Sequence, residues 1–220
     1  MIVAVLGEKG GTGKTTISTN LAGMRSAAGR DVLVVDADRQ GSASYWAEAR
    51  EEKGLASVSC VQKFGDGLAR AIKDMSRRYD DVVIDIASGD SREIDGALRV
   101  ADTVIIPVQP SGIDMWTLGL LDDRISEAMQ GNKKLIAHVV INRASTNPRD
   151  NDAQDAKDAM AVCSSLNITD IVVRDRVSIK RAVPAGITAV EYKPADSKAA
   201  IEMTALYELA FGENGHKNGN

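Results

Sequence analysis

The sequence predicts an α/β fold, in which helices cover both faces of a mainly parallel, twisted sheet. Short apolar runs of strand length begin near residues 2, 32, 82, 103, 135 and 171. Several intervening stretches repeat apolar residues at helical spacing, as at Leu68, Ala71, Ile72 and Met75. Strands that alternate with helices favour a parallel sheet, because parallel neighbours need a long crossover connection. Residues 42–65 have no clear periodicity and remain unassigned.

Composition and charge are those of an ordinary globular domain. Of 220 residues, 44% are apolar and 26% charged, with a net charge of −4. We expect one domain over residues 1–212, followed by a disordered polar tail at 213–220. Cys60 and Cys163 lie far apart without metal-ligand spacing, which favours a reducing compartment. Since no leader or membrane-spanning run is found, the sequence predicts a cytoplasmic protein with no membrane partner.

Residues 7–16, with the sequence GEKGGTGKTT, are predicted to bind a polyphosphate. They follow a predicted strand and precede a predicted helix, the context that a phosphate-binding loop requires. Glycines let the backbone turn tightly and aim N–H groups at the phosphates, near the positive end of the helix. Lys14 is expected to reach the outer phosphates, and the Thr15 hydroxyl to bind Mg²⁺. The predicted nucleotide-binding residues here are Gly10, Gly11, Thr12, Gly13, Lys14, Thr15 and Thr16.

A second lysine narrows this interpretation. Glu8 stands where the general pattern G-x-x-x-x-G-K-[ST] has glycine, and residues 9–15 instead follow K-G-G-x-G-K-T. This resembles the deviant Walker A motif of the ParA/MinD-type ATPases. The resemblance implies a P-loop ATPase that uses ATP and Mg²⁺, with Lys9 and Lys14 taking part in catalysis. It also implies a homodimer on ATP binding, in which Lys9 reaches the phosphates held by the other subunit. A generic nucleotide-binding loop is the alternative.

Three aspartates are candidates for water and metal positioning. Asp36 and Asp38 follow one apolar run, and Asp85 lies near the end of another, where ligands bind at the edge of an open sheet. The first pair resembles the family's D-x-D-P-Q segment, with Arg39 replacing proline. The resemblance implies that Asp38 orients or deprotonates the attacking water, while Asp36, Asp85 and Thr15 serve Mg²⁺. Solvated loop acids are the alternative for Asp36 and Asp38.

Two later strand ends resemble nucleotide-bordering segments of the family. Asn142, followed by Arg143, ends a predicted strand, and an amide suits an adenine edge because it both donates and accepts hydrogen bonds. A turn residue is the alternative for Asn142. Residues 106–111 with Asp114 resemble a family segment near the nucleotide and the dimer interface. Asp114 is equally well explained as an acid at a helix N-terminus.

A basic stretch lies between Val172 and Lys193, where five basic residues and two acids give a net charge of +3. In a protein of net charge −4, this local excess is a candidate surface for duplex DNA. A solvated helix face with ordinary ion pairs is the alternative, and Arg176 could instead contact nucleotide or a partner subunit. The candidate DNA-binding residues are Arg174, Arg176, Lys180 and Arg181.

Together, the resemblance implies a small ParA-type partition ATPase without an N-terminal DNA-binding extension. Such a protein binds DNA without sequence specificity as an ATP-bound dimer, is then associated with the nucleoid, and works with a centromere-binding adaptor protein. A MinD-like ATPase, or another ParA-like ATPase that positions a different cargo or assists DNA transfer, is the alternative function. The segment before residue 213 lacks a lysine-rich amphipathic helix of the membrane-anchoring kind. A nucleotide-stabilised scaffold with negligible turnover is a further, non-enzymatic alternative.

Overall fold

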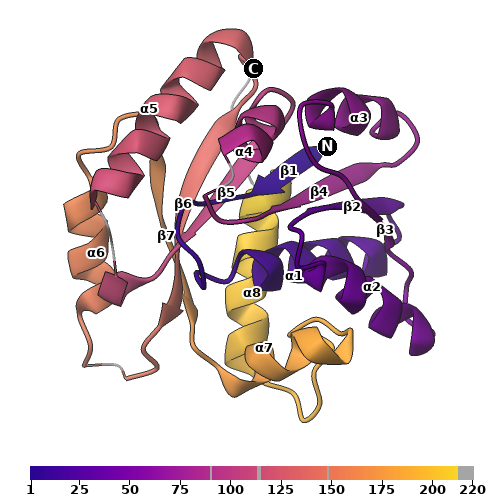
Figure 1. The fold of residues 1–220 in the computed structure, drawn as a ribbon. Coiled ribbons are helices and arrows are strands. Elements are labelled where there is room, and N and C mark those ends of the chain that lie inside the picture. The colour runs from indigo at the N-terminus through magenta and orange to yellow at the C-terminus, as the bar shows by residue number, and fades with distance from the viewer. Residues whose placement is uncertain (90, 113–114, 148, 213–220) are drawn as a thin grey trace, which may run out of the picture.

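A single parallel sheet forms the centre of the molecule (Figure 1). The computed structural model describes residues 1–89, 91–112, 115–147 and 149–212, so Asp114 and the predicted tail at 213–220 lie outside the described residues. The sheet has seven strands in the order β3-β2-β4-β1-β5-β6-β7, and every pairing is parallel. The strands are β1 (Ile2–Val5), β2 (Val32–Ala37), β3 (Ser59–Gln62), β4 (Asp81–Ile86), β5 (Thr103–Val108), β6 (Ile136–Ala144) and β7 (Asn167–Arg174).

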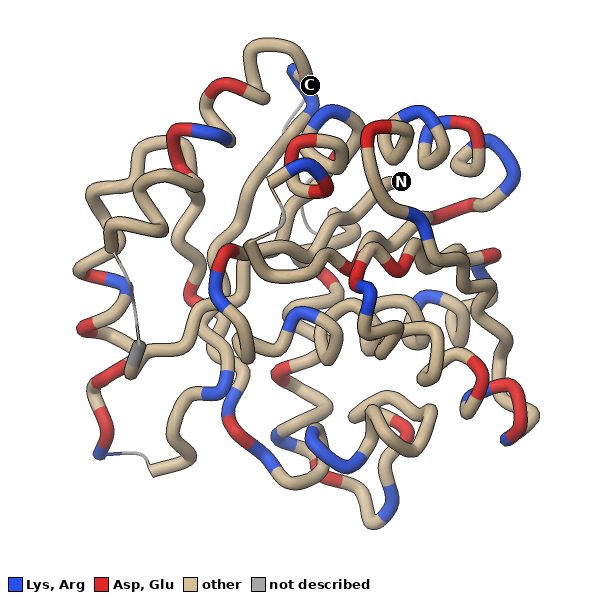
Figure 2. Tube along the Cα trace, viewed as in Figure 1, with Lys and Arg blue, Asp and Glu red and all other residues tan. Residues whose placement is uncertain are grey.

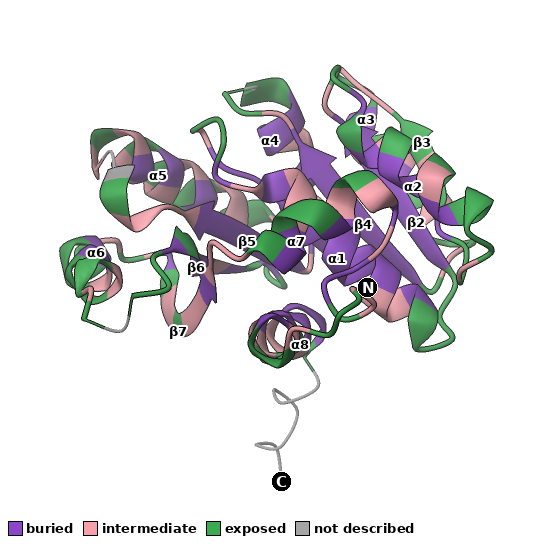
Figure 3. Cartoon of the chain, turned by 90° about the horizontal axis from the view of Figure 1, so that it is seen from below, coloured by how far each residue is buried: buried purple, intermediate pink, exposed green. Residues whose placement is uncertain are grey.

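Helices cover both faces of the sheet, which confirms the predicted fold class (Figure 1). One buried apolar cluster joins one face of the sheet to α3, α4, α5 and α6, and a second joins the other face to α1, α2, α7 and α8. The outward sides of the helices are largely exposed (Figure 3). The helices are α1 (Lys14–Ala27), α2 (Ser42–Glu52), α3 (Leu68–Met75), α4 (Ser91–Leu98), α5 (Met115–Gly131), α6 (Asp152–Met160), α7 (Val177–Ala182) and α8 (Ser197–Phe211), with short 3-10 turns at Pro110–Gly112 and Val183–Ala185.

The unassigned segment 42–65 contains α2 and β3. The buried residues of α2 have regular helical spacing, but Arg50 occupies one of these positions and interrupts the apolar pattern: they are Ala43, Trp46, Ala47 and Arg50. Strand β3 lies at the edge of the sheet and its residues are mostly exposed, so it lacks the continuous apolar run of the inner strands. Both elements therefore escape a search based on apolar periodicity.

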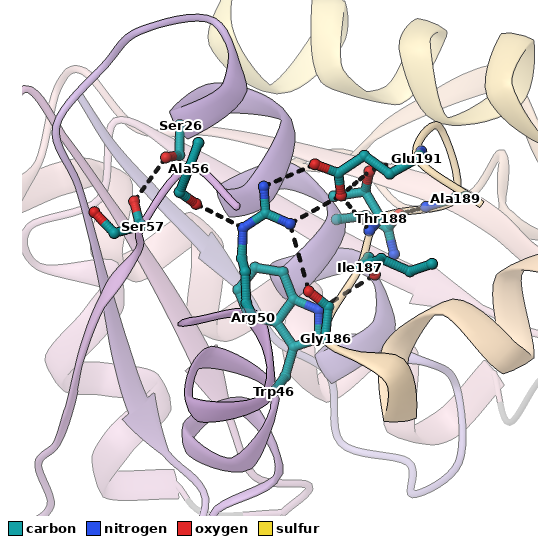
Figure 4. A network of polar contacts seen from close by, with 11 residues as sticks. Ser26, Trp46, Arg50, Ala56, Ser57, Gly186, Ile187, Thr188, Ala189 and Glu191 are labelled. Atoms are coloured by element: carbon teal, nitrogen blue, oxygen red, sulfur yellow. Dashed lines mark hydrogen bonds and ion pairs between the residues drawn. The ribbon is translucent and has the colours of Figure 1, made fainter. Parts of the chain in front are cut away.

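Arg50 joins α2 to the segment that follows α7 (Figure 4). Its guanidinium is fully buried, and its two terminal nitrogens donate to the Glu191 carboxylate at 2.8 Å each. Its Nε donates to the Ala56 carbonyl at 2.8 Å, and its carbon lies 5.4 Å from the centre of the Trp46 ring. Burial raises the pKa of Glu191, but the hydrogen bonds from Arg50 and Thr188 and the charge of Arg50 together outweigh this, so the pKa is lowered overall. The buried cation is thus fully paired, which a charge in this position requires.

Gly186 is predicted to be intolerant of any side chain. It has a left-handed φ of 68°, and an added Cβ would lie 2.5 Å from both the backbone carbonyl carbon of Ala49 and the backbone nitrogen of Arg50. We expect Gly186→Ala to lower the free energy of unfolding by about 3 kcal/mol, from left-handed strain and overpacking together. Gly54→Ala is the matched control, since Gly54 also has a left-handed φ of 64° but open space around it, and it should cost about 1 kcal/mol. Equal losses in urea unfolding would contradict the close packing at Gly186.

Candidate active site

The glycine-rich loop lies between β1 and α1, at the carboxyl edge of the sheet. Gly11 and Gly13 have left-handed φ angles of 77° and 92°, which glycine adopts without steric cost. Gly13 caps the N-terminus of α1, so the first residue of the helix is Lys14. The two lysines of the loop differ in burial, because Lys14 is 7% exposed whereas Lys9 is an exposed residue. The loop therefore buries one lysine and leaves the other accessible at the surface.

The amine of Lys14 is held by groups of its own loop and of the loop after β4. Its Nζ donates to the Lys9 carbonyl at 3.0 Å and contacts the Ser88 hydroxyl. Burial lowers the pKa of Lys14, while the negative charges of Asp85, Asp38 and Glu8 oppose this shift. The loop after β4 begins at Ala87. Ser88 is the residue that the structure brings to the lysine, while Asp90 of this loop lies outside the described residues.

Asp85 is buried beneath the loop with one oxygen available. The Ser18 hydroxyl donates to its Oδ1 at 2.8 Å, and its Oδ2 has no hydrogen-bond partner among the described residues. Burial raises the pKa of Asp85 to about 7, against the hydroxyls of Thr15 and Ser18, which favour the charged form. A carboxylate oxygen without a partner near the Thr15 hydroxyl fits Mg²⁺, which prefers oxygen ligands and repays the burial of the charge. Thr15 and Asp85 are thus the residues that would hold the metal.

Asp36 and Asp38 shape the turn that follows β2. Asp36 is fully buried and stands beside Asp85 in the register of β2 and β4. Its carboxylate accepts hydrogen bonds from the backbone N–H of Asp38 at 3.1 Å and from the N–H and hydroxyl of Ser44 at 2.9 and 2.8 Å. Asp38 is half-buried, and its Oδ1 accepts from the N–H of Gln40 at 2.9 Å. Asp36 therefore anchors the turn that presents Asp38.

Arg39 replaces the family's proline in this turn, and the structure gives it a contact. Its guanidinium carbon lies 5.0 Å from the centre of the Phe64 ring. Phe64 follows β3, so the contact ties the turn after β2 to the adjacent edge of the sheet. The side chain of Arg39 thus holds the turn by packing, where proline would restrict the backbone directly.

The end of β6 holds the glycine loop from the other side. The Asn142 amide nitrogen donates to the Thr12 carbonyl at 2.6 Å, and Arg143 Nη1 donates to the Gly11 carbonyl at 2.7 Å. Arg143 has a left-handed φ of 56°, which is uncommon for a residue with a side chain and marks a constrained position. Gln109, which sequence reasoning did not single out, also donates to the Gly11 carbonyl, at 3.1 Å. A role of Asn142 at the adenine edge stays a prediction.

The predicted DNA-binding residues lie around an open hollow beside the loop. Three of the four line it, and Arg181 is exposed nearby. Arg176 and Arg174 pair with Glu202 of α8, with N–O distances of 2.6 and 3.3 Å, and Lys180 pairs with Asp175 at 2.7 Å. Basic and acidic positions are accordingly mixed in this part of the chain (Figure 2). The hollow measures about 300 Å³ and is lined by Gly13, Thr16, Asn142, Arg143, Arg174, Asp175, Arg176, Ile179, Lys180, Val183 and Pro184.

Comparison with known families agrees with this geometry. Residues 3–189 match the family model described as the CobQ/CobB/MinD/ParA nucleotide binding domain. The chain belongs to this family. Among curated ParA/MinD relatives, the chain is 30% identical over 205 residues to the Maintenance of carboxysome distribution protein A of Halothiobacillus neapolitanus, covering 93% of each chain. It is 28% identical over 176 residues to the Chromosome-partitioning ATPase Soj of Thermus thermophilus, covering 67% of this chain and 64% of Soj.

The fold is also that of a solved MinD. The septum site-determining protein MinD of Pyrococcus horikoshii, in complex with Mg-ADP, matches with a TM-score of 0.69 and 21% identity, covering 100% of this chain and 99% of that one. As a member of the ParA/MinD ATPases, the chain hydrolyses ATP and uses Mg²⁺. Within the described ranges, no helix is both long and apolar enough to cross a membrane.

The arrangement suits phosphoryl transfer to water, which needs positioning and charge neutralisation more than covalent chemistry. Bound Mg²⁺ supplies positive charge against the phosphate oxygens. The N–H groups of the glycine loop and the Lys14 amine lie where a polyphosphate binds, at the N-terminus of α1. Asp38, in the turn after β2, carries a negative charge that opposes the lowering of the Lys14 pKa. The role of Asp38 at an attacking water stays a prediction.

Asp85→Asn tests the metal assignment, because asparagine keeps the volume and the Ser18 contact but removes the charge. We expect the affinity for ATP with Mg²⁺ to fall about 10- to 100-fold. The affinity for ADP in the presence of EDTA should stay within about threefold of wild type, because no metal contributes there. Calorimetric titration of each nucleotide with and without Mg²⁺ measures both. An equal loss under the two conditions would mean that Asp85 supports the loop and has no role at the metal.

Proposed function

We propose that this chain is a positioning ATPase, which binds DNA as an ATP-bound dimer and distributes a protein cargo through an adaptor. The supporting observation is its likeness to the carboxysome distribution protein of H. neapolitanus, at 30% identity over 93% of both chains. This is the alternative that the sequence offered beside plasmid or chromosome partition. By cargo we mean a protein assembly of any kind, and by adaptor the protein that links this assembly to the ATPase.

Dimerisation by ATP is supported by the opposite placement of the two loop lysines. Lys14 is buried within its own site, whereas Lys9 is exposed at the loop surface. Two subunits that face each other across their nucleotides bring two polyphosphates together, and these repel. An amine that crosses to the partner's phosphates offsets this repulsion and makes the contact depend on ATP. Lys9 is the residue proposed to do this.

Binding to duplex DNA is proposed for α7 and its surroundings. Lys180 and Arg181 are exposed there, while Glu202 neutralises much of the charge of Arg174 and Arg176. One such patch is weak, but a dimer presents two patches to the same duplex. Because affinity grows with the number of phosphates neutralised, DNA binding then follows the ATP state.

Partition of a plasmid or chromosome is the second candidate, supported by the likeness to Soj over 176 residues. The two functions share the nucleotide and DNA surfaces and differ in what the adaptor binds. Deleting the gene in its host separates them. Loss of even spacing of a protein assembly, with DNA inheritance intact, supports the first function, whereas loss of plasmid or chromosome inheritance supports the second.

Lys9→Ala is predicted to abolish ATP-dependent dimerisation while nucleotide binding by the monomer remains, because Lys14 and the loop N–H groups are unchanged. Analytical ultracentrifugation with Mg²⁺ and a non-hydrolysable ATP analogue measures the dimer. Arg70→Ala is the control for loss of a positive charge, since Arg70 is a highly exposed residue of α3. A dimer of wild-type affinity in the Lys9 variant would exclude the proposed contact.

Replacing Lys180 and Arg181 together by alanine is predicted to weaken binding to random-sequence duplex DNA in the ATP state. If each subunit loses two phosphate contacts, the slope of log affinity against log salt should fall by up to about 3.5 for the dimer. Arg70 and Lys73 of α3 are the matched control pair, because both are exposed and lie on the opposite face of the sheet. An unchanged slope would place the DNA surface elsewhere.

A further inference from the structure

Glu8 places a negative charge at the entrance of the phosphate-binding loop. It precedes Lys9 directly, and its charge is among those that act on the buried Lys14 amine. The side chain is only 18% exposed, so water screens it incompletely. An acid in this position repels an incoming polyphosphate and competes with it for the loop lysines. Binding of a polyphosphate therefore requires a positive charge that neutralises Glu8 and holds its carboxylate away from the phosphates.

Helix α5 supplies a cation at this point. Arg124 Nη1 lies 3.4 Å from Glu8 Oε1. The same guanidinium lies 3.6 Å from the Asp95 carboxylate and donates to the Ser91 hydroxyl at 3.2 Å, both on α4. Arg124 is 30% exposed, so its ion pairs are partly shielded from water. One side chain thus joins the glycine loop to two helices beyond the nucleotide site.

Glu8 also lies where the loop approaches α5. A small cavity of about 50 Å³ lies between the first half of the loop, the end of β5 and α5. Gly7, Glu8, Lys9 and Thr12 line it from the loop, and Thr117, Leu118 and Leu121 from α5. Arg124 follows Leu121 by almost one helical turn, so the two side chains lie on the same face of α5. Leu121 lines the cavity, and Arg124 contacts Glu8.

We propose that Arg124 is a positioning residue for ATP, which neutralises Glu8 and holds its carboxylate on the α4–α5 side of the loop. Without Arg124, Glu8 faces the phosphates as an uncompensated charge and pairs with the loop lysines that should bind them. The acid at residue 8 and the arginine at residue 124 are therefore one functional unit. This concerns nucleotide binding by one subunit and does not depend on the proposed dimer or DNA surface.

The test is a double-mutant cycle read by nucleotide affinity. Arg124→Gln should weaken binding of a non-hydrolysable ATP analogue with Mg²⁺ by about tenfold, the order expected for one uncompensated charge several ångströms from the phosphates. Glu8→Gln alone should bind at least as tightly as wild type. The double variant should return to within about twofold of wild type, because no charge is left to neutralise.

Rescue distinguishes this role from a structural one. If Arg124 acted only by packing α4 against α5, removing Glu8 would not restore affinity, and the double variant would bind as weakly as Arg124→Gln. Arg99→Gln is the matched control, since Arg99 and Arg124 both line a second groove, between α4 and α5, but Arg99 does not line the cavity beside Glu8; this variant should bind like wild type. Wild-type affinity in Arg124→Gln, no rescue in the double variant, or a tenfold loss in Glu8→Gln would each overturn the proposal.

Discussion

The buried hydrogen bond from the Ser18 hydroxyl to Asp85 joins the two elements on which the nucleotide site depends. Ser18 lies one turn into α1, and Asp85 lies near the end of β4, beside β1. The bond sets how α1, and with it the glycine loop, sits over the carboxyl edge of the sheet. It also leaves the second oxygen of Asp85 without a partner among the described residues, so the same contact that aligns the loop leaves a site for a cation.

The loop is then held from both sides. Asn142 and Arg143 at the end of β6, and Gln109 after β5, donate to its carbonyl groups. With those carbonyl groups occupied, the loop N–H groups are left to face a ligand, as an anion site requires. The two lysines of this loop differ in burial. Lys14 is buried in the site of its own subunit, whereas Lys9 is exposed at the surface of the loop, where a partner subunit can reach it.

The sequence predicted the fold class, the family and the loop because these depend on local patterns. Inner strands of a parallel sheet are continuous apolar runs, and the spacing of glycines and lysines in residues 9–15 is specific. Contacts between distant residues were not predictable. Glu202 lies 26 residues after Arg176, outside the stretch whose charge was counted, yet it pairs with two of the four candidate residues, Arg174 and Arg176. Gln109 lies in the segment 106–111 that resembles a nucleotide-bordering part of the family, but nothing in the sequence sets it apart from its neighbours, and the same holds for Ser88 in the loop after β4. Arg50 concealed α2, because a buried, paired arginine looks like a surface residue in sequence.

The central claim is that the two loop lysines serve two different nucleotides. A crystal structure of the protein with Mg²⁺ and a non-hydrolysable ATP analogue tests it most directly. The account predicts a dimer in which the Lys14 amine contacts the phosphates of its own subunit and the Lys9 amine contacts those of its partner. A structure in which the Lys9 amine contacts only its own nucleotide, or points into solvent away from any partner, would contradict it.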